Sequence, residues 1–180
     1  MRAVDKKGDP IPWYTYPAID FLSQRDYRDK SILEFGSGQS TLWWAARAKF
    51  VLSMEEDPHW FTETSARVPS NVEIYQVALE IENIEKLVQS RGIKFDVIII
   101  DGGPRRKLVA LSFKYLAPQG VIILDNAEGY GFYEEIKSRE CRRIDFFGFA
   151  PGVVLRHCTS MAFVNDCFLL SPEISIPEIS

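Results

Sequence analysis

The chain has 180 residues, of which 46% are hydrophobic and 26% charged, and its formal net charge is −4. These values are typical of one globular domain, and the excess of acidic residues provides no basic surface for nucleic acid, so the expected partner is a small molecule. The three cysteines lack the paired spacing of a disulfide framework or a zinc site, and no apolar run reaches the length of a membrane span, so we expect a cytoplasmic protein without a membrane partner.

Strand and helix patterns alternate from residue 17 to residue 165 and predict a single α/β domain over residues 1–167. The predicted strands cover residues 31–35, 50–57, 72–78, 94–101, 121–126, 143–147 and 158–164. The main predicted helices between them cover residues 41–48, 58–67, 80–91, 107–116 and 134–139. Residues 168–180 are polar and interrupted by prolines, which predicts a flexible tail.

A group of aromatic residues precedes the first helix, which we expect to begin at Pro17 because proline fits the first helical turn. The aromatic side chains are those of Trp13, Tyr14 and Tyr16. They either fill the end of the sheet or form a wall over a ligand, since ligand pockets are mostly apolar with a few polar groups. Tyr16 is the residue that we expect to face a ligand.

Residues 31–42 read S-I-L-E-F-G-S-G-Q-S-T-L and predict a buried strand, a glycine turn and the start of a helix. Gly36 and Gly38 allow the main chain to approach a ligand closely. A dinucleotide fingerprint would have a third glycine where this chain has Thr41. Glu34 would oppose a pyrophosphate but suits a ligand with a cationic amino group, such as S-adenosylmethionine.

Acidic residues follow two further strands. Glu55 lies about 20 residues after Gly36, the offset at which an acid reaches ribose hydroxyls, although a solvated turn is the alternative for the run of acids here. Residues 94–101 form an apolar run that is typical of a central parallel strand, and this run ends in Asp101. The carboxyl ends of such strands are where open α/β sheets bind ligands.

The glycine turn resembles motif I of the class I S-adenosylmethionine-dependent methyltransferases, in which an acid and any one residue precede G-x-G. Ser40 stands where that family often has a third glycine. The resemblance implies a Rossmann-like seven-stranded sheet, mostly parallel with an antiparallel last strand and with helices on both faces. It also implies that S-adenosylmethionine is bound by a set of residues near the strand ends: Glu34, Gly36, Ser37, Gly38, Glu55, Asp101 and Tyr16.

The ends of the fourth and fifth predicted strands are similar to those of catechol and caffeoyl-CoA O-methyltransferases. In that group an Asp after the fourth strand and an Asp-Asn pair after the fifth bind a metal, and the matching residues here are Asp101, Asp125 and Asn126. Their oxygen atoms would suit magnesium or another divalent cation. Pro104 stands where that group has its catalytic lysine. The alternative is that these side chains only cap strand ends and contact the cofactor.

Three further residues are candidates for substrate binding or catalysis. Arg105 and Arg106 are expected to bind an anionic group of the substrate, because a guanidinium pair matches carboxylate or phosphate, and a solvated charge run is the alternative. His157 precedes the last strand and is the candidate base, which makes Asp101 and His157 the candidate catalytic residues.

The sequence therefore predicts a methyltransferase that acts on a small-molecule acceptor, with O-methylation as the expected reaction. A second hypothesis is a protein that binds the cofactor without catalysis and serves as a sensor or interaction subunit, which the absent lysine favours. The third hypothesis is an NAD-dependent oxidoreductase, and Glu34 argues against it.

Overall fold

The computed structural model describes residues 2–78, 80–164 and 166–170. Its strands are Ser31–Phe35 (β1), Phe50–Glu55 (β2), Val72–Gln76 (β3), Phe95–Ile100 (β4), Leu116–Leu124 (β5), Arg142–Gly148 (β6) and His157–Phe163 (β7). Its helices are Tyr16–Ser23 (α1), Gln39–Ala45 (α2), Pro58–Ser65 (α3), Ile81–Gln89 (α4), Arg105–Tyr115 (α5) and Phe132–Lys137 (α6), and Phe168–Leu170 form a 3-10 helix.

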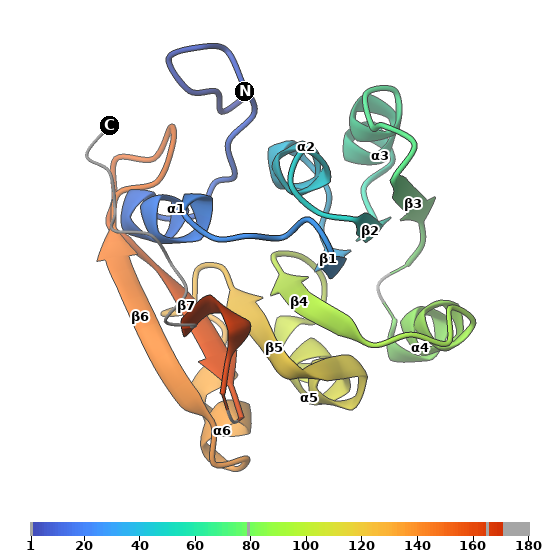
Figure 1. Ribbon diagram of the computed structural model, residues 1–180, viewed down its shortest axis with the longest axis vertical. Helices are drawn as coiled ribbons and strands as arrows, with labels where there is room; N and C mark the ends of the chain where they lie inside the picture. The colour runs from blue at the N-terminus through green and yellow to red at the C-terminus, as the bar shows by residue number, and fades with distance from the viewer. Residues whose placement is uncertain (1, 79, 165, 171–180) are drawn as a thin grey trace.

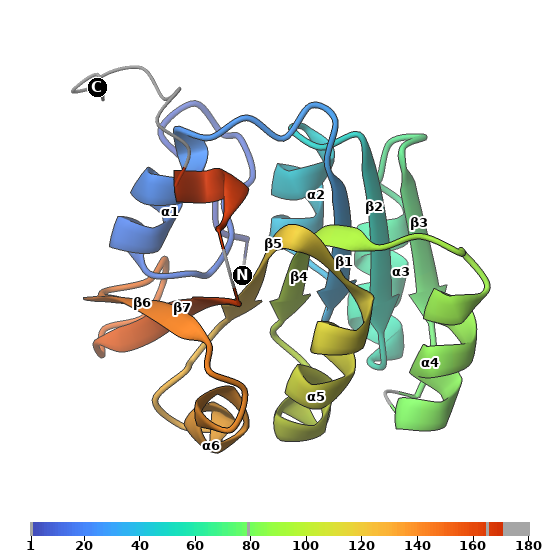
Figure 2. The same cartoon turned by 60° about the horizontal axis from the view of Figure 1, so that its bottom comes forward.

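One seven-stranded sheet runs through the molecule in the order β3-β2-β1-β4-β5-β7-β6. The pairs from β3 to β5 are parallel, whereas β7 pairs antiparallel with both β5 and β6. Figure 1 shows α1, α2 and α3 on one face of this sheet and α4, α5 and α6 on the other, and Figure 2 shows the same layers after a turn of 60°. The predicted mixed sheet with helices on both faces is confirmed.

Apolar residues fill both sides of the sheet, because its central strands are covered twice. Ile98 and Ile100 of β4 pack in the core under α4, α5 and α6, while Val97 and Ile99 face the core that contains Trp43 of α2. All four of these β4 side chains are fully buried. This double burial explains why residues 94–101 carry no alternation of apolar and polar residues.

The strand order predicts a ligand-binding crevice at the carboxyl ends of β1 and β4. The chain passes from β1 outward to β2 and β3 and then returns to β4 on the other side of β1. At such a switch point the connections leave in opposite directions, which opens a crevice at the carboxyl ends of the strands. Because β7 is antiparallel, its first residue, His157, lies at this same edge.

Two predicted boundaries differ from the structure. The fifth strand, predicted over residues 121–126, is β5, which starts at Leu116 and shows a register shift against β4 between Phe95 and Val97. The predicted tail begins with the 3-10 helix, whose Leu169 is 1% exposed, so packed structure extends to Leu170. Residues 171–180 lie outside the described residues.

In the part of the chain that the structure describes, none of the helices combines the length and the apolar character needed to cross a bilayer.

The glycine turn after β1 yields a prediction about stability. Gly36 has a φ of 95°, and a Cβ there would lie 3.1 Å from Gly102 N and 3.2 Å from the main-chain carbon of Asp101. We expect Gly36→Ala to lower the free energy of unfolding by roughly 2–4 kcal/mol through backbone strain and overpacking. Urea denaturation measures this loss.

Gly38→Ala is the matched control, because a Cβ at Gly38 would meet nothing within 4 Å. Its free energy of unfolding should stay within about 1 kcal/mol of that of the unchanged protein. Equal losses in the two variants would contradict the assigned packing of Gly36 against the start of the β4–α5 connection.

Candidate functional site

A cleft of about 450 Å³ opens at the carboxyl ends of the parallel strands. Its walls come from the turn after β1, the end of β2, the residues after β4 and β5, and the start of β7. Most of the predicted site residues line it: Gly36, Ser37, Gly38, Glu55, Asp101, Arg105, Asp125, Asn126 and His157. The fold therefore brings together side chains that are more than 100 residues apart in the sequence.

The glycine turn is tied to the neighbouring strands by its main chain. Gly36 N–H donates to Met54 O at 2.9 Å, and Asp101 N–H donates to Phe35 O at 2.9 Å. Gly38 N–H donates to the Thr41 hydroxyl at 2.9 Å, which closes the turn onto the first residues of α2. The predicted turn is thus a fixed main-chain wall of the cleft.

Glu34 lies under this turn and is fully buried. Its Oε2 accepts hydrogen bonds from the Thr41 hydroxyl at 2.5 Å and from the Ser53 hydroxyl at 2.8 Å, so the side chain joins β1, α2 and β2. Oε1 has no hydrogen-bond partner among the described residues. Glu34 is not on the cleft wall, and its hydrogen bonds give it a role in positioning the turn.

The charge state of Glu34 reflects this position. Burial raises the pKa of Glu34 to about 7, and the nearby charge of Asp101 also raises it, although hydroxyl hydrogen bonds act in the opposite direction. Glu34 is therefore harder to ionise in the folded protein than in the unfolded chain.

Glu55 ends β2 and is 8% exposed. Its Oε2 accepts from Ser37 N–H at 2.6 Å, and its Oε1 accepts from the main-chain N–H groups of Glu56 and Asp57 at 2.9 and 2.8 Å. Each carboxylate oxygen has two lone pairs, so Oε2 can still accept a hydroxyl from the cleft. The structure thus places the predicted ribose acid beside the glycine turn.

The side chains of Asp101 and Asn126 and the main chain of Asp125 lie around the guanidinium of Arg105. Asp125 Oδ1 accepts the Thr159 hydroxyl at 3.0 Å, while the guanidinium of Arg105 donates to Asp125 O at 2.7 Å and lies 3.3 Å from Asp101 Oδ1. Arg105 Nη1 also lies 3.4 Å from Asn126 Oδ1. A divalent ion on the same oxygen atoms would meet this fixed positive charge at close range.

The predicted metal centre stays a prediction. Within residues 2–78, 80–164 and 166–170, no group of three or more His, Cys, Asp and Glu side chains is arranged to hold an ion. Asp101, Asp125 and Asn126 would instead offer two carboxylates and one amide, and the guanidinium of Arg105 lies among oxygen atoms of these three residues.

Asp101 and Asp125 are both held close to other charges. Burial raises the pKa of Asp101, the neighbouring Asp125 raises it further, and Arg105 lowers it. Burial also raises the pKa of Asp125, against the hydrogen bond from Thr159 and the charge of Arg105. Arg105 is thus the internal counter-ion of two carboxyl groups that line the cleft.

Arg105 and Arg106 do not point to one site, so the prediction that they bind an anionic group together is wrong. The Arg105 side chain is 11% exposed and points into the cleft, whereas the Arg106 side chain is 58% exposed and pairs with Glu134 and Glu135 of α6. Successive residues of α5 diverge because a helix turns by about 100° per residue. Arg106 therefore follows the alternative of a solvated charge.

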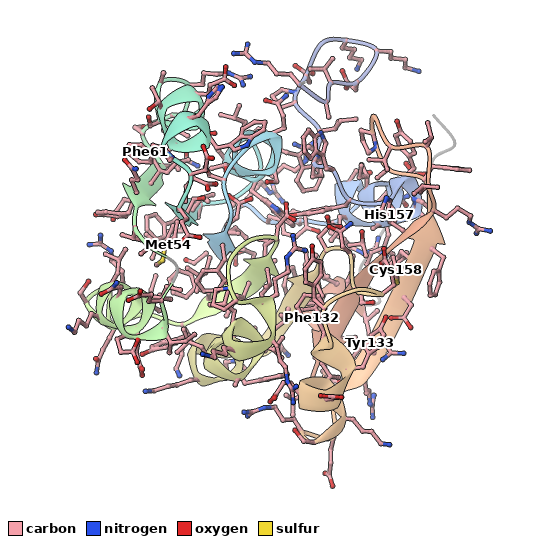
Figure 3. All side chains as sticks on the ribbon, turned by 180° about the vertical axis from the view of Figure 1, so that it is seen from behind. Met54, Phe61, Phe132, Tyr133, His157 and Cys158 are labelled. Carbon is pink, nitrogen blue, oxygen red and sulfur yellow. The ribbon has the colours of Figure 1, made fainter. Side chains whose placement is uncertain are left out.

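His157 lies at the cleft with a carboxylate beside it. Its Nδ1 is 3.0 Å from Glu128 Oε1, and Glu128 Oε2 accepts Cys158 N–H at 2.9 Å. Its Nε2 is buried without a partner among the described residues. Figure 3 labels His157 and Cys158 at the start of β7, with Phe132 and Tyr133 of α6 near them.

Comparison with solved structures identifies the architecture. No protein-family model and no curated protein sequence matches the chain. An O-methyltransferase from Bacillus cereus, in complex with S-adenosylhomocysteine, is 20% identical over 88% of this chain and 86% of its own, with a TM-score of 0.61. The chain has the class I S-adenosylmethionine-dependent methyltransferase fold.

Two further structures with this methyltransferase fold agree. The O-methyltransferase TomG from Streptomyces achromogenes, in complex with S-adenosylmethionine, is 18% identical over 82% of this chain and 76% of its own, with a TM-score of 0.62. The precorrin-6y C5,15-methyltransferase from Geobacter metallireducens is 14% identical over 83% and 87%, with a TM-score of 0.61. The family resemblance predicted from the glycine turn is confirmed at the level of the fold.

Sequence reasoning missed Trp60 and Glu128, and it preferred Tyr16 to Trp13 as the aromatic wall of the cleft. Trp13 lines it together with Trp60, and their rings meet edge to face at 6.0 Å, whereas Tyr16 begins α1 and is absent from the cleft wall in the described structure. Trp13 thus replaces Tyr16 as the aromatic wall. Trp60 and Glu128 carried no sequence signal beyond their position one short turn after a strand that ends at the cleft.

Glu34 leads to a prediction about pH. Between its ordinary pKa of 4.5 and about 7, the unfolded chain ionises this residue while the folded protein keeps it protonated, so its contribution to stability falls as pH rises. Glu34→Gln removes this pH-dependent loss of stability, which amounts to roughly 3 kcal/mol across the window between the two pKa values. Relative to the unchanged protein, the variant should gain stability from pH 4.5 to pH 8.

Urea denaturation of both proteins across this pH range measures the difference. The acids that the two proteins share, Asp101 included, cancel in it. Curves that stay parallel from pH 4.5 to pH 8 would contradict the assigned burial of Glu34.

Proposed function

We propose that this protein binds S-adenosylmethionine and transfers its methyl group to a hydroxyl oxygen of a small-molecule acceptor. The observation that carries the proposal is the bond between Glu55 Oε2 and Ser37 N–H, at 2.6 Å, within the cleft. It joins an acid at the end of β2 to a glycine turn after β1, in a fold whose neighbours include O-methyltransferases crystallised with S-adenosylmethionine or S-adenosylhomocysteine.

The residues at the cleft suit the parts of this cofactor. Glu55 offers a hydroxyl acceptor for the ribose, and the turn at Gly36 and Gly38 lets the main chain approach closely. Asp101 offers a carboxylate for the ammonium group of the methionine end, and Glu34 holds the turn from beneath. Binding a cation beside Asp101 would relieve the repulsion between Asp101 and Asp125.

The reaction needs an electrophilic methyl group and a deprotonated acceptor. Bound S-adenosylmethionine supplies a methyl carbon to which the acceptor oxygen bonds as the carbon–sulfur bond breaks, with the electron pair going to sulfur. The protein holds the acceptor and removes its proton. His157 is the residue that would take this proton on Nε2, an atom that is buried beside the cleft and that the acceptor would have to reach.

Glu128 sets the tautomer of His157 that can act in this way. Nδ1 lies 3.0 Å from Glu128 Oε1, which accepts its proton, and at the longer distance of 3.3 Å from Asn126 Nδ2, a donor that favours the opposite tautomer. Burial opposes ionisation of Glu128, but main-chain N–H groups and His157 outweigh it and hold the pKa of Glu128 below its usual value. An ionised carboxylate only accepts, so Nδ1 carries the proton and Nε2 keeps its lone pair.

The cofactor assignment is tested with Glu55. Glu55→Gln replaces one carboxylate oxygen with an NH₂ group, which cannot accept the main-chain N–H groups of Ser37, Glu56 or Asp57 that this oxygen accepts. The affinity for S-adenosylmethionine should therefore fall by about 1–3 kcal/mol. Isothermal titration calorimetry measures the change. Glu56→Gln is the control, because Glu56 is exposed, and NAD is the control ligand. Tighter binding of NAD than of S-adenosylmethionine would overturn the assignment.

The base is tested by comparing the two histidines of the chain. His157→Gln should lower kcat for methyl transfer by about 10²–10⁴-fold, since that is the usual contribution of a general base. His59 is exposed on α3, and His59→Gln should leave kcat unchanged. The rates are measured with a panel of hydroxyl acceptors.

Glu128→Gln separates the tautomer argument from simple loss of structure. A glutamine amide can turn its NH₂ toward Nδ1, which would leave Nε2 protonated and lower kcat while the affinity for S-adenosylmethionine stays the same. Equal kcat values for the unchanged protein and the His157→Gln variant would remove His157 from the mechanism. Cofactor binding without transfer to any acceptor would instead favour a binding or sensing protein.

A further inference from the structure

Arg105 occupies the centre of the acidic part of the cleft. Its Nη1 donates to Asp125 O at 2.7 Å, and its Nη2 donates to Asp101 O. Asp101 Oδ1 and Asn126 Oδ1 lie 3.3 and 3.4 Å from the same group. Oxygen atoms from the ends of β4 and β5 thus surround one guanidinium.

The position of this guanidinium is fixed by its surroundings. Arg105 is the first residue of α5, and its side chain is only 11% exposed. The ring of Tyr130 covers its face, with 4.2 Å from Arg105 Cζ to the ring centroid. A planar cation held at its edge by oxygens and at its face by an aromatic ring has little freedom to leave.

We propose that Arg105 takes the place of a divalent cation in this cleft and that the acceptor consequently presents a single hydroxyl group rather than a chelating pair of adjacent hydroxyls. The inference rests on the proposed methyl transfer. A metal ion has open positions and can bind two acceptor oxygens at once, whereas both η nitrogens of Arg105 are already engaged by the protein. One acceptor oxygen then meets His157, the residue that receives its proton.

The remaining walls indicate the body of the acceptor. Trp13 and Trp60 stand on one side of the cleft, and Ala150 and Val153 line it before β7. Trp13 is 41% exposed, so a large apolar surface is open to a ligand. Aromatic rings pack edge to face or offset on such walls. The acceptor class is therefore a monohydroxylated aromatic compound.

The cation part is tested with Mn²⁺ alone, without cofactor or acceptor. Calorimetric titration of the unchanged protein should show no stoichiometric Mn²⁺ binding. In Arg105→Ala, Asp101 and Asp125 lose their counter-ion, and millimolar Mn²⁺ should raise the melting temperature by roughly 3 °C or more. Arg106→Ala, which removes the exposed neighbour, should respond like the unchanged protein.

Two results would overturn this part. One is stoichiometric Mn²⁺ binding by the unchanged protein that Asp125→Asn abolishes. The other is an identical Mn²⁺ response of the unchanged protein and Arg105→Ala. If Arg105→Ala does not fold, the titration of the unchanged protein still decides. Because this experiment requires no methyl transfer, its outcome is separate from that of the proposed function.

The acceptor part is tested with 4-nitrophenol and 4-nitrocatechol, which share a ring and differ by one adjacent hydroxyl. We expect kcat/KM for the single hydroxyl to equal or exceed that for the pair, with rates unchanged by excess EDTA. Transfer to the catechol alone, or a loss in EDTA that Mg²⁺ restores, would overturn the inference. Inactivity toward every acceptor would count against the proposed function, while the Mn²⁺ titration would still report on Arg105.

Discussion

The cleft depends on two carboxylates that hold the turn after β1. Glu55 accepts the N–H of Ser37 from the side, and Glu34 accepts the hydroxyl of Thr41 from below. Together they connect the turn to β2 and to the start of α2, so that the main chain at Gly36 can lie against the residues after β4. Without these acceptors the turn would lose the contacts that shape one wall of the site.

Charge balance organises the opposite wall. Asp101 and Asp125 end neighbouring parallel strands, so the sheet itself brings their carboxyl groups together. Asp125 is buried and Asp101 is partly buried, so their carboxylates repel each other, and a positive group between the strand ends reduces the cost of that repulsion. Arg105 fills this role because α5 begins directly after the β4 connection and directs its first side chain back over the strand ends. Asp101, Arg105 and Asp125 thus form one local cluster of charged groups.

The parts of this molecule that follow from local patterns were predictable from the sequence. The strand at residues 94–101 and the turn at Gly36 depend on burial and on backbone conformation, which adjacent residues reveal. The acid Glu55 follows from a fixed offset that the fold imposes. By contrast, the predicted start of the fifth strand at residue 121 was too late, because β5 includes Pro118 and tolerates an irregular pairing near its start.

The errors at the site have a common physical origin. Residue types at strand ends show which oxygens can meet, but they do not show which cation lies between them. Asp101 and Asn126 fit a metal by composition, and the Arg105 guanidinium that lies 3.3 and 3.4 Å from their side-chain oxygen atoms is found only in three dimensions. The one available sign was the neighbouring Pro104, which removes the expected lysine and moves the positive charge one residue along the chain. Partners such as Glu128 and His157 are likewise defined by three-dimensional contact.

The distribution of charge also links stability to ligand binding. The pKa values of Glu34, Asp101 and Asp125 are all raised, chiefly by burial, so these acids are ionised at a cost in the folded protein. A ligand with positive charge lowers that cost only in the folded protein, and this differential effect stabilises the fold as it binds. A neutral or anionic ligand provides no such gain. The raised pKa values of Glu34 under the glycine turn and of Asp101 and Asp125 in the cleft therefore predict that a cationic ligand stabilises the folded protein more than a neutral or anionic ligand does.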